Sequence, residues 1–196
     1  LFRSVCDAVE TINADQQVMF GLGRRKYVLS SASRGGNRDI CAFSIIGMDI
    51  DLYDPAKPHK NLPRTKQEAL ELLNSFALPP SMVVDSGSGL HSYVFLDEDV
   101  TIEDEVQCKQ AQEFLRAFYR GFAAHALPYS FDATHDLSRG LRLPGSMNLK
   151  DLKNPKLVEV LELNHGRRYS LEQIRNVSVE VIKAPRKVAN LASPGE

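Results

Sequence analysis

Two aspartates and the apolar run before them form the first group of residues that could do chemistry. Asp49-Ile50-Asp51 ends a nearly unbroken apolar stretch that begins at Ile40. On a strand, residues two apart project to the same face, so both carboxylates would point into one small volume. Carboxylates held that close repel each other unless a cation lies between them, and hard oxygen ligands suit Mg²⁺ or Mn²⁺. The alternative is a solvated strand end at which one aspartate caps a loop.

A second group combines small residues with a histidine in Ser86-Gly87-Ser88-Gly89-Leu90-His91. Small residues in a hairpin turn let backbone N–H groups approach an anion closely. His91, at the start of the following strand, could donate a hydrogen bond to a phosphate oxygen. The alternative is a flexible hairpin with an incidental histidine at its base.

A third acidic position follows an aromatic residue in Phe131-Asp132. Asp132 could complete a three-carboxylate metal site with Asp49 and Asp51. Asp136 could take the same role.

Basic residues follow this aspartate at intervals. Arg139, Arg142 and Lys150 supply fixed positive charge, and arginine can bind a phosphate through two parallel hydrogen bonds. A solvated basic loop, or an arginine paired with Asp136, would explain the same residues.

The elements that must position these residues form one mixed α/β or α+β unit, because strands and helices alternate irregularly. Apolar alternation and turn residues predict strands over 18–22, 27–31, 40–52, 82–84, 90–96, 131–132 and 157–161. Helical spacing and capping residues predict helices over 1–13, from 65 to before the prolines at 79–80, over 101–126, and a short helix from 170.

The charge balance excludes a protein that holds nucleic acid through its overall field. The 196 residues carry 24 Lys and Arg against 25 Asp and Glu. Segment 21–40 has five basic residues and one acid, segment 136–156 has five and two, and 97–105 has six acids and no base. We expect both positive segments to lie beside the proposed site. A hydrophobic share of 43% excludes wholesale disorder, and no apolar stretch approaches the roughly 20 residues of a membrane span.

Cysteine usage predicts a cytoplasmic protein. Cys6, Cys41 and Cys108 are widely spaced and no CxxC pair occurs, which argues against a disulfide framework or a structural zinc. The chain begins at Leu1, and we expect it to be a piece of a longer protein. We expect a catalytic domain over 1–183 and a flexible linker over 184–196.

Taken in order, these groups resemble the archaeo-eukaryotic primase (AEP) superfamily. The likeness is to its primase-polymerase type, in particular to replicon-encoded or CRISPR-associated bacterial members. Asp49-Ile50-Asp51 resembles the first motif of that family, Gly89-Leu90-His91 the second and Phe131-Asp132 the third. The flanks at 80–91 and 141–150 agree, and the resemblance spans about residues 18–162. One departure is Gly89, where the family often has serine. The other is Asp136, which competes with Asp132 for the third carboxylate; we prefer Asp132 because it follows Phe131 directly and precedes the two arginines at a distance similar to that in the family.

The resemblance implies two α/β modules around a cleft, one with an RRM-like antiparallel sheet. It implies template-directed nucleotidyl transfer to a 3′-hydroxyl on single-stranded or primed DNA. Asp49, Asp51 and Asp132 would bind two Mg²⁺ or Mn²⁺ ions and act in catalysis. The residues expected to bind the nucleoside triphosphate are Ser88, Gly89, His91, Arg139, Arg142, Lys150 and Arg34. Fused or associated partners would be a helicase, a priming module or CRISPR adaptation proteins.

Two other classes of protein use some of these residues. A metal-dependent nuclease or phosphohydrolase also clusters aspartate and histidine, but it gives no reason for a basic series suited to a whole triphosphate. A non-catalytic RRM-like binder stacks bases on exposed aromatic residues, and this chain has no Trp and no such aromatic run. Primer initiation and extension, with dNTPs or with NTPs, all fit the same residues.

Overall fold

The computed structural model describes residues 17–28, 35–55, 61–131 and 135–178. The helix expected over 1–13, the linker expected over 184–196, Arg34 and Asp132 lie outside these residues. The fold built by the described residues is mixed α/β with antiparallel sheets, as expected from the sequence.

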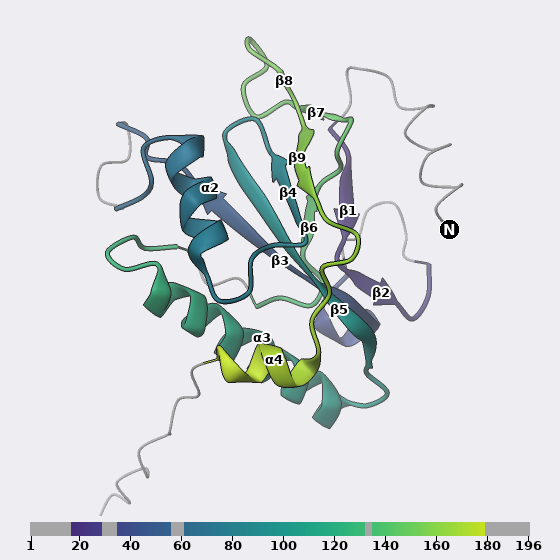
Figure 1. Cartoon of the computed structure of the whole chain (residues 1–196). Helices are drawn as coiled ribbons and strands as arrows, with labels where there is room; N and C mark the ends of the chain where they lie inside the picture. Colours follow the sequence, from purple (N-terminus) through teal and green to yellow (C-terminus); the bar gives the residue numbers. More distant parts are fainter. Residues whose placement is uncertain (1–16, 29–34, 56–60, 132–134, 179–196) are drawn as a thin grey trace, which may run out of the picture.

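A five-stranded antiparallel sheet is the centre of the fold (Figure 1). Its strand order is β2 (Gly23–Arg25), β3 (Ile40–Asp51), β5 (Gly89–Thr101), β4 (Met82–Asp85) and β9 (Glu159–Leu163). The long pair β3 and β5 sets Asp49 opposite His91 and Asp51 opposite Gly89. Residues directly opposite each other share a face of the sheet, so the first two sequence motifs meet on one face.

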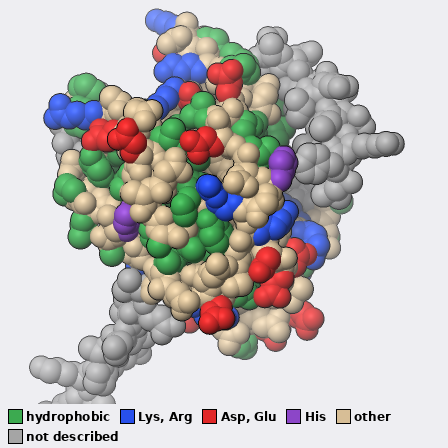
Figure 2. All heavy atoms as spheres, in the orientation of Figure 1, with side chains coloured by type: hydrophobic (Ala, Val, Ile, Leu, Met, Phe, Trp, Pro, Cys, Tyr) green, Lys and Arg blue, Asp and Glu red, His purple; other side chains and the backbone are tan. Residues whose placement is uncertain are grey.

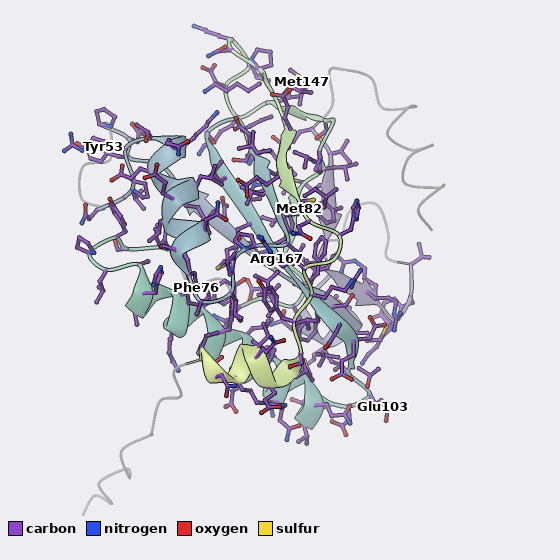
Figure 3. The ribbon with its side chains drawn as sticks, viewed as in Figure 1. Tyr53, Phe76, Met82, Glu103, Met147 and Arg167 are labelled. Atoms are coloured by element: carbon purple, nitrogen blue, oxygen red, sulfur yellow. The ribbon has the colours of Figure 1, made fainter. Side chains whose placement is uncertain are left out.

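Three helices cover the other face of the sheet. They are α2 (Lys66–Ser75), α3 (Glu105–His125) and α4 (Leu171–Asn176). Thr65, Asp104 and Ser170 cap their N-termini by accepting backbone N–H groups. The starts predicted at 65 and 170 are confirmed, whereas the helix expected from 101 begins at Glu105, because β5 continues to Thr101. Phe76, just after α2, packs edge-on against Phe122 of α3, with ring centroids 5.4 Å apart (Figure 3). The main core therefore lies between the helices and the sheet.

Short strands cover part of the opposite face. β1 (Met19–Gly21) pairs with β6 (Gly140–Arg142), and β7 (Met147–Asn148) pairs with β8 (Lys156–Leu157). A second apolar cluster joins them to the large sheet, and in it the ring of Phe20 stacks on Tyr93 at 5.9 Å. A 3₁₀ turn, η1 (Asn37–Asp39), precedes β3.

Three predicted strands differ from the structure in its described residues. Phe131, expected in a strand over 131–132, lies in no strand. Of the strand expected over 27–31, only Tyr27 and Val28 lie in the described residues, and neither is in a strand. The structure has the strand β2 earlier, over Gly23–Arg25. The glycine at 23 lets β2 pack closely against Ile40 and Leu137, because a Cβ there would lie 2.7 Å from both Ile40 Cγ2 and Leu137 O. The strand expected over 157–161 is split into β8 and β9 around the buried Val158.

Two described arginines of the first basic segment, Arg24 and Arg38, pair with acids of the segment 97–105, and for them the expected position beside the site is wrong. Arg24 pairs with Asp99 at 3.2 Å, and Arg38 pairs with Glu105 at 3.0 Å. Arg24 lies opposite Ala42, seven residues before Asp49 on β3 and so about 23 Å away. Figure 2 shows acidic and basic side chains gathered together at the lower right, where β5 runs into α3 in Figure 1. The acidic segment therefore neutralises these cations far from the aspartate pair.

Among the described residues, no helix has the length and apolar character needed to cross a membrane.

Candidate functional site

Asp49 and His91 face each other near the end of the β3–β5 pair, where β3 ends and β5 begins. The Asp49 Oδ1 atom lies 4.0 Å from Nε2 of His91. The Asp49 side chain is 36% exposed, while that of His91 is 1% exposed. Asp51, two residues further on the same face, is exposed. The strand thus presents two carboxylates to solvent beside one buried imidazole, as the spacing of the first motif predicts.

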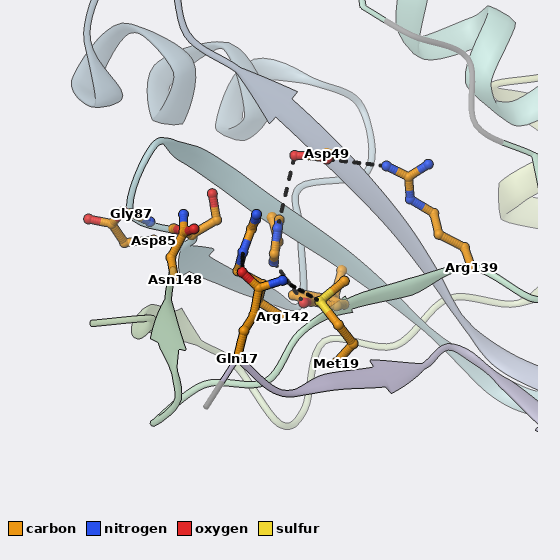
Figure 4. A network of polar contacts seen from close by, with 11 residues as sticks. Gln17, Met19, Asp49, Asp85, Gly87, Arg139, Arg142 and Asn148 are labelled. Carbon is orange, nitrogen blue, oxygen red and sulfur yellow. Dashed lines mark hydrogen bonds and ion pairs between the residues drawn. The ribbon is translucent and has the colours of Figure 1, made fainter. Parts of the chain in front are cut away.

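Arg139 reaches the same carboxylate from the segment before β6. Its Nη2 atom lies 3.3 Å from Asp49 Oδ2, and its side chain is 17% exposed (Figure 4). The Arg139 carbonyl accepts a hydrogen bond from the backbone N–H of Leu22, which fixes the chain at this point. The buried Nε atom of Arg139 has no partner among the described residues. A guanidinium with an unused donor therefore lies against the acidic pair.

His91 is neutral at physiological pH. Its pKa is lowered from 6.5 to about 4, chiefly by burial and then by the nearby guanidinium groups of Arg142 and Arg139, while the carboxylates of Asp51 and Asp85 oppose the shift. The approach to Asp49 is therefore not an ion pair at pH 7. The imidazole acts there as a neutral hydrogen-bonding group.

Tyr93 is the second buried polar residue of this face. Its hydroxyl lies 3.3 Å from His91 Nδ1. Burial and the Asp49 carboxylate raise the pKa of Tyr93, so its O–H stays protonated and can donate to Nδ1. A neutral imidazole that accepts at Nδ1 carries its proton on Nε2, on the side of Asp49.

The glycine-rich turn between β4 and β5 is tightly ordered. The Ser86 N–H donates to Gly89 O at 3.0 Å, and the Gly87 N–H donates to Asp85 Oδ1 at 2.8 Å. Gly87 has a φ of +88°, which favours glycine. Because these N–H groups are used inside the turn and Gly89 belongs to β5, the exposed Ser88 is the residue best placed to offer its N–H and hydroxyl to an anion.

Gly89 is held by close packing. A Cβ at this position would lie 2.4 Å from the carbonyl oxygen of Ile50. The serine that the resembling family often carries here would therefore push β3 and β5 apart in this chain. The departure from the family pattern follows from how closely these two strands approach.

The remaining basic residues approach from β6 and β7. Arg142 lies on β6, opposite Met19 of β1, and its Nε–H donates to Gln17 Oε1 at 3.5 Å (Figure 4). It is close enough to His91 to lower the pKa of that residue. Lys150 is exposed, and its backbone N–H donates to Asn148 Oδ1 at 3.0 Å. The structure thus brings Arg139 and Arg142 to the Asp49–His91 pair, and it fixes the backbone of Lys150.

Only Phe131 of the third motif lies in the described residues. Phe131 lines the same small cavity as Asp49 and Ile50, whereas Asp132 itself lies outside the described residues. Asp136 is exposed, and it lines a different cavity with Ile46 and Gly47. Within the described ranges, no group of three His, Cys, Asp or Glu residues could hold a metal ion. Asp49 and Asp51 supply two hard oxygen donors that suit a divalent cation.

Three residues of the site had no role assigned from sequence. Tyr93 could have been found, since it lies two residues after His91 on a strand and shares its face. Asn148, whose side chain contacts the glycine-rich turn, carries no local signal because its partner lies 62 residues away. Lys66 on α2 pairs with Asp85 on β4 at 2.5 Å. This contact also carries no local sequence signal, because the two residues lie on different elements.

Comparisons with known proteins support the fold. No protein-family model matches the sequence, and no curated protein matches it. Among solved structures, the chain is similar to the AEP domain of the primase-polymerase of cyanophage S-2L, with a TM-score of 0.51 and 19% sequence identity. The match covers 90% of this chain and 76% of that chain. The chain therefore has the fold of an AEP domain of the primase-polymerase type.

Proposed function

We propose that this chain is a template-directed nucleotidyltransferase, a DNA primase or polymerase that adds nucleotides to a 3′-hydroxyl. The observation that carries the proposal is the cluster of Asp49, His91 and Arg139 at the end of the β3–β5 pair, in a chain with the AEP fold. Carboxylates, a neutral imidazole and a guanidinium are the groups that bind a divalent cation and a triphosphate together.

The basic and neutral groups would hold the triphosphate. Arg139 and Arg142 would bind phosphate oxygens through charge-assisted hydrogen bonds. His91 would donate from Nε2 as a neutral ring, so its contribution would not depend on protonation near pH 7. Ser88, on the exposed tip of the turn, would offer its N–H and hydroxyl. Lys150 and Arg34 stay predictions as further nucleotide contacts.

The acidic pair would bind Mg²⁺ or Mn²⁺. The donor chemistry fits, because Asp49 and Asp51 are hard carboxylates on one face of β3. When bound, divalent ions would activate the attacking hydroxyl and neutralise charge on the leaving pyrophosphate. Asp132 stays a prediction as the third carboxylate. Its described neighbour Phe131 lines a cavity beside Asp49, which favours this choice over Asp136.

The proposal is tested by extending a primed DNA template with Mn²⁺ and with dNTPs and NTPs in parallel. We expect Asp49→Asn or Asp51→Asn to lower extension by more than roughly a hundredfold, because each removes a carboxylate without changing side-chain size. A template without primer, supplied with the same nucleotides, separates initiation from extension.

Asp97→Asn is the matched control. Asp97 is an exposed aspartate on β5, six residues beyond His91, and it is expected to leave extension unchanged. Extension that survives in both Asp49→Asn and Asp51→Asn would refute the metal assignment. Degradation of the template in place of extension would favour a nuclease.

A further inference from the structure

A single buried amide joins two segments of the candidate site. Asn148, on β7, is 4% exposed. Its Nδ2 atom donates to the carbonyl of Ser86 at 2.6 Å, and its Oδ1 accepts the backbone N–H of Lys150 at 3.0 Å. Both halves of the amide are thus satisfied by backbone groups, one on the glycine-rich turn and one on the segment that carries Lys150.

The packing around Gly87 shows how closely the turn and the hairpin meet. A Cβ on Gly87 would lie 2.8 Å from Lys156 Cβ and 3.2 Å from Asn148 Nδ2. Lys156 is the partner of Asn148 across the β7–β8 pair. The β7–β8 hairpin therefore rests directly on the turn, and Figure 4 shows Asn148 beside Gly87 and Asp85.

The hairpin itself is firmly attached to the main sheet. Val158, which follows β8, is fully buried in the second apolar cluster. Its N–H donates to Ser146 O at 2.9 Å, and its carbonyl accepts the N–H of Gly145 at 2.8 Å. Asn148 is thus anchored independently of the turn that it contacts.

We propose that Asn148 is a positioning residue that locks the Ser86–Gly89 turn and the Lys150 backbone into one rigid nucleotide-binding unit. The expected effect on nucleotide binding rests on the proposed function. The two hydrogen bonds of Asn148 do not, because they can be tested in the protein alone. Order in the turn that exists before binding reduces the entropy lost on binding.

Amide hydrogen exchange on the whole chain, without nucleotide, is the first test. Asn148→Asp keeps an acceptor for the Lys150 N–H but loses the donor to Ser86 O. We expect the Gly87 amide to exchange roughly tenfold faster or more in this variant, while the Lys150 amide stays protected. Asn148→Ala removes both bonds, so both amides should exchange faster. If Asn148 only stabilised the fold as a whole, the Gly87 and Lys150 amides would be expected to exchange faster together in both variants.

Asn154→Ala is the matched control, because Asn154 is an exposed asparagine in the loop of the same hairpin. It should leave both amides unchanged. Unchanged exchange of Gly87 in both Asn148 variants, or equal acceleration in Asn154→Ala, would overturn the proposal. Should the Asn148 variants fail to fold, the wild-type side-chain amide decides: protection of the Asn148 Nδ2 protons supports the contact, and exchange as fast as that of Asn154 refutes it.

Nucleotide kinetics form the second test. In Asn148→Asp we expect the KM for the nucleoside triphosphate to rise roughly tenfold, with kcat changed much less, because the turn loses order but the acidic pair is untouched. A fall in kcat at unchanged KM would overturn the positioning role. A wild-type chain that binds no nucleoside triphosphate would refute the proposed function, and the exchange experiment would still decide whether Asn148 holds the turn.

Discussion

Replacing Gly89 by alanine tests the close approach of β3 and β5 at the site. An added Cβ would lie 2.4 Å from Ile50 O, whereas ordinary contact begins at 3.4 Å. The two strands would have to separate locally by about 1 Å, because the obstacle is a backbone carbonyl that cannot rotate away. Gly89 is not among the glycines with positive φ, so the alanine backbone itself is not strained.

The expected cost follows from this overlap. Forcing an extra methyl group into packed surroundings costs about 1–3 kcal/mol. For a chain of this size, about 2 kcal/mol corresponds to a fall in Tm of roughly 4–8 °C. Ile50 lies between Asp49 and Asp51, so the same displacement would move both carboxylates, and extension activity should fall even below the new Tm.

Thermal unfolding of Gly89→Ala, with Gly36→Ala as control, measures the effect. Gly36 is exposed, has an extended backbone with φ −128°, and has nothing within 4 Å of an added Cβ. It should unfold within about 1 °C of the wild type. If Gly89→Ala unfolds at the same temperature as Gly36→Ala and extends a primer normally, the strands do not approach as closely in solution, and the explanation for glycine at this position is wrong.

Three further predictions concern the same face. His91 has a folded pKa of about 4 against 6.5 unfolded, so below pH 6.5 only the unfolded chain gains this proton. The wild type should therefore lose up to about 3 kcal/mol of unfolding free energy between pH 6.5 and 4 that His91→Gln does not lose, as measured by denaturant titration at each pH. Arg139→Gln removes a cation that lowers the pKa of His91, so an NMR titration should show a higher His91 pKa in this variant. An unchanged pKa would contradict the position of Arg139 beside Asp49 and His91. Gly47→Ala should lower Tm less than Gly89→Ala, because its Cβ would meet the flexible end of the Leu22 side chain at 2.5 Å, and an equal loss would argue against that distinction.

Features set by nearby residues were predicted well from the sequence. The N-caps at Thr65 and Ser170 and the long strand that begins at Ile40 depend on neighbours within about four positions, and the structure confirms them. The shared direction of Asp49 and Asp51 follows from strand periodicity alone. The family resemblance was confirmed at the level of the fold.

Features set by contacts between distant elements were not predictable in the same way. The basic segment before β3 was expected beside the site, but Arg24 and Arg38 lie against acids of the β5–α3 region, because antiparallel pairing brings those ends together. The neutral state of His91 depends on its burial, which no local pattern reveals.

The sequence by itself determined which groups were present and which face of a strand they would share, since side-chain alternation and helix capping are local properties of the chain. Only the tertiary structure decided how these groups meet. Arg139 reaches Asp49 across 90 positions, and Asn148 reaches Ser86 across 62. Such contacts exist because packed elements fix distant backbones at hydrogen-bonding distance, and burial then sets the charge state and rigidity of what they hold.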